Sequence, residues 1–216
     1  ISELMEGRLE KYYNFIDSWN DIQVLTPTKK GMLGTHNLNK VLQDVLNPKS
    51  RDKNEKKYGN KVFREGDRVM QIINDYDIEW KEIGNSLFEN DGEGTGIFNG
   101  DMGVIVSIDN EYNRLTVNYD GKIVTYSNEN LDEIEHAYAI TVHKSQGSEF
   151  KAIIMPIVAV SPMLMTRNLF YTGVTRGKNL VVLIGNEGIM HAMIDNNRVD
   201  ERYTGLSERL GENALT

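Results

Sequence analysis

The chain has 216 residues, a formal net charge of −8 at pH 7 and no cysteine. The lack of cysteine excludes disulfides and thiolate metal sites, and the acidic balance argues against a polybasic protein that holds nucleic acid by charge alone. No apolar run approaches the roughly 18 residues of a membrane span, and no basic-then-apolar leader opens the chain, so we expect a cytoplasmic protein without a membrane partner. The first residue, Ile1, is not methionine, which indicates a fragment of a longer chain or N-terminal processing.

The N-terminal part of the chain alternates helix and strand patterns. Apolar residues at helical spacing predict an amphipathic helix over 3–18, and residues 21–25 predict a short buried strand. Proline and glycine mark a loop over 26–31, and a helix follows over 35–46 with Thr35 as its expected N-cap. A strand–loop–helix unit is the building block of a parallel α/β sheet.

The middle of the chain has a different pattern. The basic run 49–57 is interrupted by acidic residues and is expected to be a solvated loop. Short strands of period two follow, at 66–73, 103–108, 114–119 and 122–126. Asp120-Gly121 is a strong hairpin signal, and the glycine-rich segment 92–96 is expected to be a loop. This pattern predicts a small SH3-like β-barrel. Its expected core contains Val69, Ile105, Val117 and Val124.

After residue 136 the α/β pattern returns. Predicted strands lie at 137–142, 152–158 and 180–185, with a helix over 166–176 and a further helix capped by Asn186. The last two strands are continuously apolar, as in a sheet that is covered on both faces. The predicted fold class is therefore α/β. One parallel-sheet domain comprises residues 1–61 and 137–216, and a β-barrel comprising residues 62–136 is inserted into it.

A dense polar cluster follows the strand at 137–142. Its hydrogen-bonding side chains are Thr141, His143, Ser145 and Gln146. Such groups suit phosphates and sugars, and ligands of open parallel sheets bind at the carboxyl ends of strands. Gly147 permits close approach of a ligand to the backbone, and the Glu149 carboxylate can accept a hydrogen bond from a ribose hydroxyl. Taken singly, each of these residues fits a polar helix cap equally well.

A second polar segment, 169–178, places Thr172 and Arg176 four residues apart on the predicted helix. A guanidinium on a rigid helix can stabilise the charge that spreads over a γ-phosphoryl group in its transition state. Alone, Arg176 followed by Gly177 would be an ordinary helix C-terminus.

Together, the sequences TVHKSQGSEF at 141–150 and LFYTGVTRGK at 169–178 resemble motifs V and VI of superfamily 1 DNA helicases, closest to the RecD-like branch, which includes the exodeoxyribonuclease V alpha subunit and TraA. Residues 24–48 are similar to the motif IV region of that family. Residues 63–76 and 97–103 resemble the entry to its SH3-like 2B insertion. The resemblance implies a RecA-like motor domain, 2A, interrupted by 2B.

The resemblance also implies residue roles. Arg176 is carried over as the catalytic arginine finger. The nucleotide-binding residues carried over are Gly147, Glu149, Arg176 and Lys29. The nucleic-acid-binding residues carried over are Thr26, Asn74, Thr141, His143, Ser145 and Gln146. Lys29 could serve either ligand, or it could simply be solvated.

The family's phosphate-binding loop, G-x-x-x-x-G-K-[ST], is missing, because no Lys-Ser/Thr follows the glycines at 92–96. We therefore expect ATP and Mg²⁺ to be bound mainly by an N-terminal motor domain of the same protein, and the fragment alone to be inactive. The resemblance implies an ATP-dependent helicase that moves 5′-to-3′ on single-stranded DNA in recombination or repair, with further recombination or nuclease subunits as partners. The alternatives are the helicase part of a conjugative relaxase, an RNA helicase of the same superfamily, or a non-enzymatic binding module with a degenerate motor fold.

Overall fold

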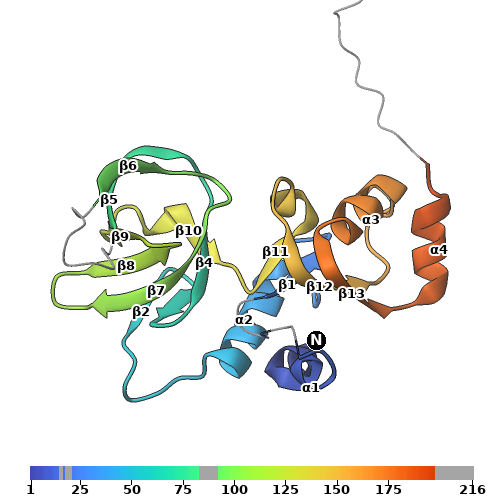
Figure 1. Ribbon diagram of the computed structural model, residues 1–216, viewed down its shortest axis with the longest axis horizontal. Coiled ribbons are helices and arrows are strands. Elements are labelled where there is room, and N and C mark those ends of the chain that lie inside the picture. The colour runs from blue at the N-terminus through green and yellow to red at the C-terminus, as the bar shows by residue number, and fades with distance from the viewer. Residues whose placement is uncertain (15–16, 18–20, 83–91, 198–216) are drawn as a thin grey trace, which may run out of the picture.

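The computed structural model (Figure 1) describes residues 1–14, 17, 21–82 and 92–197. It contains a parallel sheet with helices and, beside it, a larger antiparallel sheet. We call the first the α/β part. We call the second, from Arg68 to His136, the β-module. Along the described stretches of the chain, no helix has the length and apolar character needed to span a membrane.

The α/β part is built on a four-stranded sheet in the order β11-β1-β12-β13. Every neighbouring pair of its strands is parallel, which confirms the predicted α/β class. The strands are β1 (Ile22–Thr26), β11 (Ala139–Thr141), β12 (Phe150–Ile157) and β13 (Gly177–Gly185). In sequence, the whole β-module lies between β1 and β11.

Successive apolar side chains along these strands point to opposite faces of the sheet, so both faces are apolar and both are covered by helices. Ile22 and Val24 of β1 face a core shared with helix α2 (Thr35–Leu46) and with the N-terminal turns η1 (Leu4–Arg8) and α1 (Leu9–Tyr12). Leu25 faces the opposite core, which packs against α3 and α4. These two helices are α3 (Arg167–Val174) and α4 (Glu187–Asp195), and α4 lies at the end of the molecule away from the β-module (Figure 1).

Two helix predictions need correction. The expected N-terminal helix is broken at Gly7, whose φ is +94°, and its regular part ends at Tyr12; residues 15–16 and 18–20 lie outside the described residues. The helix at 35–46 has the predicted bounds, but Gly34 is its N-cap and Thr35 is its first helical residue. Backbone carbonyls of the preceding loop accept hydrogen bonds from the first helical N–H groups, so a side-chain cap is not needed.

The β-module is a seven-stranded antiparallel sheet in the order β10-β4-β7-β8-β9-β5-β6. Its strands are β4 (Arg68–Gln71), β5 (Asp75–Glu82), β6 (Glu93–Ile97), β7 (Met102–Asp109), β8 (Arg114–Tyr119), β9 (Lys122–Tyr126) and β10 (Ile134–His136), with the turn η2 (Leu131–Glu133). The predicted core residues are confirmed as buried: Val69, Ile105, Val117 and Val124. In the described residues no pairing joins the two end strands, so a closed barrel is not confirmed.

Local predictions within and beside the β-module had mixed outcomes. The Asp120-Gly121 hairpin is confirmed, with both residues at positive φ between β8 and β9. The loop expected at 92–96 is wrong, because this segment forms β6 and pairs with β5. The basic run at 49–57 is not simply a loop, because β2 (Glu55–Tyr58) forms a hairpin with β3 (Lys61–Arg64). The domain boundary expected at residues 61 and 62 falls inside β3, and the division into domains remains a prediction.

Candidate functional site

The polar turn after β11 begins at the carboxyl edge of the parallel sheet. Thr141 ends β11 and pairs in register with Thr26, which ends β1. The Thr141 hydroxyl caps the turn η3 (Val142–Ser145) by accepting a hydrogen bond from the Lys144 backbone N–H at 3.3 Å. The structure therefore brings two of the predicted residues together at one edge, as parallel strands require.

Two of the predicted hydroxyls face inward. The side chain of Thr26 is buried and donates to the Leu33 carbonyl at 2.6 Å, which closes the loop between β1 and α2. Ser145 is also buried, and its hydroxyl donates to the Val142 carbonyl at 2.7 Å. The structure presents neither hydroxyl to a ligand, and both fix the shape of their loops.

The rest of the turn projects into solvent. His143 and Gln146 are exposed, and within the described part of the chain their side chains make no hydrogen bond. Gly147 has a φ of +87°, and a Cβ atom there would meet nothing within 4 Å. Its backbone conformation, not lack of space, is therefore what favours glycine.

Arg176 lies beside this turn. Helix α3 ends at Val174, not at 176 as predicted, so Arg176 stands in the short link to β13. Its side chain is half-buried and donates from Nη1 to the Ser148 carbonyl at 3.1 Å and from Nε to the Thr172 carbonyl at 3.2 Å. These contacts hold the guanidinium against the end of the polar turn.

Glu149 is next to Arg176 at the same edge. Its exposed carboxylate forms an ion pair with Lys178 at 2.9 Å. Hydrogen bonding and charge attraction from Lys178, with a smaller contribution from Arg176, lower the pKa of Glu149 below its usual value. Lys178 was not among the predicted residues, although it lies two positions beyond Arg176.

The turn spans two opposite edges of the sheet. Ala152 of β12 is level with Ile22 at the start of β1, whereas Thr141 is level with Thr26 at its end. These levels are about 13 Å apart along the strand direction. The DNA-side candidates at Thr26 and Thr141 therefore lie at the carboxyl edge, while the nucleotide-side candidates Glu149 and Arg176 lie at the amino edge.

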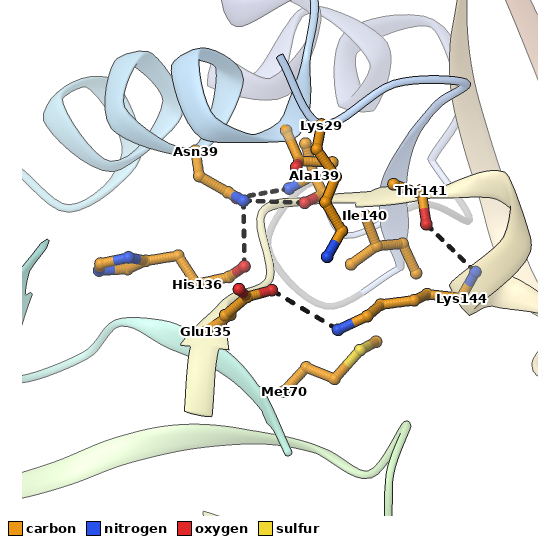
Figure 2. A pocket seen from close by; sticks show the side chains of 10 residues that line it. Lys29, Asn39, Met70, Glu135, His136, Ala139, Ile140, Thr141 and Lys144 are labelled. Atoms are coloured by element: carbon orange, nitrogen blue, oxygen red, sulfur yellow. Dashed lines mark hydrogen bonds and ion pairs between the residues drawn. The ribbon is translucent and has the colours of Figure 1, made fainter. Parts of the chain in front are cut away.

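Lys29 lies at the carboxyl edge, away from the other nucleotide-side candidates. Figure 2 shows it over a small pocket that Asn39, Glu135, Thr141 and Lys144 also line. Partial burial lowers the pKa of Lys144, and repulsion from Lys29 adds to this effect, while Glu135 at 3.5 Å opposes it. The pocket thus collects two ammonium groups beside the Thr141 hydroxyl.

Two residues of this pocket were missed by the sequence prediction. Lys144 lies inside the motif, but its position in a turn suggested only a solvent-exposed lysine. Asn39 binds the β10–β11 link from α2: its side-chain amide donates to the carbonyls of His136 and Ala139 and its oxygen accepts from the Ala139 N–H (Figure 2). Nothing in the sequence relates positions about a hundred residues apart, so only the structure could reveal this contact.

Asn74 lies in the β-module, apart from the turn. Its side chain accepts a hydrogen bond from the Asn99 N–H at 2.9 Å and donates to the Tyr76 hydroxyl at 3.3 Å. Asn99 belongs to the link between β6 and β7, and other residues of that link line an open cleft of about 390 Å³ that Ser148 also lines. The end of the polar turn and the β-module therefore both contribute to this cleft.

Candidate metal ligands are few around the polar turn. In the stretches of chain that the structure describes, no group of three or more His, Cys, Asp or Glu side chains could hold a metal.

Two family models match successive stretches of the chain. A family model described as the ATP-dependent RecD-like DNA helicase SH3 domain matches residues 38–119, and one described as the UvrD-like helicase C-terminal domain matches residues 136–184. The predicted SH3-like character of the insertion is thereby confirmed.

Individual relatives agree with these matches. The ATP-dependent RecD2 DNA helicase of Deinococcus radiodurans is 32% identical over 189 residues, covering 88% of this chain and 23% of that protein. The RecBCD enzyme subunit RecD of Mycolicibacterium smegmatis is 36% identical over 117 residues, covering 54% of this chain and 20% of that protein. A solved structure of coordinating Pif1 helicases at forked DNA gives a TM-score of 0.49 at 16% identity, covering 91% of this chain and 45% of that chain. The chain thus spans less than a quarter of the length of these two sequence relatives.

Proposed function

Because this chain belongs to the RecD-like family of DNA helicases, we propose that it is the C-terminal motor region of an ATP-dependent helicase that acts on DNA. The proposal includes 5′-to-3′ movement along a single strand and a role in recombination or repair, both of which rest on the family resemblance. An N-terminal motor domain of the same protein would supply the phosphate-binding loop and the ligands of Mg²⁺.

The amino edge of the parallel sheet is the proposed nucleotide side. The Arg176 guanidinium fits an anionic phosphate, because two backbone carbonyls fix its position and the preceding helix α3 packs on the sheet core. ATP, when bound, supplies a γ-phosphoryl group for transfer to water. Arg176 would stabilise the charge on that group, and the Glu149 carboxylate would accept a hydrogen bond from the ribose. Gly147 keeps the adjoining turn open to a ligand.

The carboxyl edge and the exposed turn are the proposed DNA side. Lys29, Thr141 and Lys144 line the pocket shown in Figure 2 and suit a phosphate of the DNA backbone, which would compete with the Glu135 carboxylate for Lys144. This placement favours the DNA, and not the nucleotide, as the ligand of Lys29. His143 and Gln146 project from the same turn, while Thr26 and Ser145 would support it from beneath. Asn74 would contact the strand from the β-module side of the cleft.

One observation supports the proposal best: the single segment 141–149 joins the two edges. It starts beside the proposed phosphate pocket and ends where the Ser148 carbonyl accepts a hydrogen bond from Arg176. A movement of Arg176 on nucleotide binding or release would therefore pull directly on the DNA-facing turn. This is the mechanical coupling that a translocating motor needs.

Replacing Arg176 tests the proposal. In the full-length protein that contains this chain, we expect Arg176→Ala to lower DNA-stimulated ATP hydrolysis by about 10³–10⁵-fold, the range known for arginine fingers. The fold should be retained, as circular dichroism would show. Arg167→Ala is a matched control, because Arg167 starts the helix that precedes Arg176 and, among the contacts described, its side chain binds only the Ile194 carbonyl. An ATPase rate for Arg176→Ala within a few-fold of the Arg167→Ala rate would reject the arginine finger.

A further inference from the structure

Two adjacent residues of opposite charge, Asp67 and Arg68, are buried at the junction between the β-module and the α/β part. Asp67 is fully buried and Arg68 is 9% exposed. Among the contacts described, the two side chains bind different sets of partners: Asp67 binds the end of α2 and residues 136–138, and Arg68 binds β1. A buried charge is costly unless hydrogen bonds compensate it, so the partners of each residue show what this junction holds in place.

Asp67 connects helix α2 to the segment that leads into β11. Its carboxylate accepts hydrogen bonds from Gln43 and Asn47 of the α2 region at 2.6 and 2.8 Å. It also accepts one from the Tyr138 hydroxyl at 2.9 Å, and His136 Nε2 lies 3.2 Å away. The carboxylate therefore holds two separate stretches of chain, the end of α2 and residues 136–138, around one buried point.

Arg68 connects the β-module to the centre of the parallel sheet. It is the first residue of β4, and its guanidinium donates to the Ile22 carbonyl and to the Gln23 side-chain oxygen of β1, both at 3.0 Å. The Gln23 amide in turn donates to the carbonyls of Ala137 and Tyr138 at 3.2 and 3.1 Å. Burial lowers the pKa of Arg68, yet a guanidinium remains charged at neutral pH.

A guanidinium fork fixes orientation as well as distance, because its N–H groups are coplanar and point in set directions. An apolar side chain of the same length could fill the space but could not set the angle between β4 and β1. We propose that Arg68, supported by Asp67, is a positioning residue that holds the β-module at one angle to the parallel sheet. It thereby sets the width of the cleft between the Ser148 turn and the link between β6 and β7. The link of this cleft to DNA binding rests on the function proposed above.

The first test measures the geometry without any activity. The chain has no cysteine, so nitroxide labels can be placed at Glu111→Cys in the β-module and Asn168→Cys on α3, both exposed positions, in a full-length protein freed of other cysteines. We expect one narrow distance distribution in the parent protein and a broad or shifted one for Arg68→Met. Arg68→Lys should lie between them, since it keeps the charge but not the fork. An unchanged, narrow distribution in a folded Arg68→Met protein would overturn the proposal.

The matched control is Arg64→Met. Arg64 is a buried arginine too, but its guanidinium binds the Asn47 carbonyl and Glu55, and it holds the β2–β3 hairpin to α2 without a side-chain contact to β1 in the described structure. It should lower stability without changing the label distance. If Arg64→Met broadens the distribution as much as Arg68→Met, the effect is general loosening and the specific role of Arg68 is wrong.

The second test concerns DNA. With oligo-dT as activator, Arg68→Met should raise the DNA concentration needed for half-maximal ATPase stimulation by about tenfold or more, which corresponds to about 1.4 kcal/mol of binding free energy. The DNA-free ATPase rate should stay unchanged, because the hydrogen bonds described for the Arg68 guanidinium go to β1 and not to Arg176 or Glu149. If the label distance changes but the DNA concentration for half-maximal stimulation does not, the width of the cleft has no effect on DNA binding, and that part of the proposal is wrong. A parent protein without DNA-stimulated ATPase would reject the proposed function and leave the distance test decisive for Arg68.

Discussion

Ser145 and Gln146 are neighbours in the sequence, but Ser145 is fully buried and Gln146 is exposed. The motif predicts that a polar cluster follows β11, and the structure places that cluster there. The motif cannot predict which of these side chains face a ligand. That depends on the tight turn η3, which directs successive side chains to opposite sides. The same limit applies to Thr26, whose partner Leu33 lies across a loop.

Glu133 offers a test of electrostatics at a single residue. Burial and the nearby charges of Asp75 and Asp132 raise the pKa of Glu133, while a hydrogen bond from Gln71 at 2.9 Å partly offsets this. A raised carboxyl pKa means that the folded state disfavours the charged form. The raised pKa therefore makes a favourable contribution to the free energy of unfolding. This contribution is fully present below the unfolded pKa of about 4.3, and it is lost as the pH rises through the pKa of the folded state.

Glu133→Gln should accordingly stabilise the chain at pH 7 by about 0.5–1 kcal/mol, the size of a partly screened charge interaction. The gain should shrink as the pH falls towards about 4, where the wild-type carboxyl is itself increasingly protonated. Urea denaturation at a series of pH values measures this. A gain that does not depend on pH would contradict the electrostatic explanation.

At the scale of elements, the best predictions came from strong local signals. The helix at 35–46 and the strands at 114–119 and 122–126 have the predicted bounds, because amphipathic spacing and a hairpin turn determine them locally. The prediction of a loop at 92–96 was wrong because it was based on the glycines alone. In the structure Gly94 lies against the ring of Trp80, where a Cβ atom would come within 2.5 Å. Close packing within a sheet, and not a turn, accounts for that glycine.

The start of α4 is a second local signal that the structure confirms. The Asn186 side chain accepts a hydrogen bond from the Ile189 N–H at 3.1 Å and caps the helix. Asn186→Ala should destabilise the chain by about 1 kcal/mol, whereas Asn186→Asp should preserve the cap. Hydrogen exchange of the α4 amides would show the loss most directly. Equal exchange rates in the two variants would mean that α4 is held by packing alone.

At the scale of the whole molecule, net charge limits what the isolated chain can bind. With a net charge of −8, and with its proposed DNA side limited to a few lysines and polar groups, the 216-residue chain should bind single-stranded DNA weakly. We expect a dissociation constant above about 10⁻⁶ M at physiological salt, as for weak non-specific binders. Fluorescence anisotropy with labelled oligo-dT measures it. Nanomolar affinity would show that this chain forms a complete DNA site without a second motor domain.

The relation between the two parts of the molecule could not be predicted. The sequence indicates an α/β part and a β-module, but Asp67 reaches Tyr138 and Arg68 reaches Gln23 over separations of 71 and 45 residues. Each residue alone looks like an ordinary charged position at the start of a strand. Only tertiary contact shows that both are buried.

The position of β1 in the sheet also determines the order in which the chain can fold. Strand β1 is translated before both of its neighbours, residues 139–141 and 152–154, so it cannot pair with them until the β-module has been translated. The hairpins of the β-module pair with near neighbours and can form meanwhile. Once these hairpins have folded, the segment between β1 and β11 is compact, and β11 is brought close to β1. A nascent chain stalled before residue 139 would expose an unprotected apolar edge, and chaperones that recognise such edges should bind it.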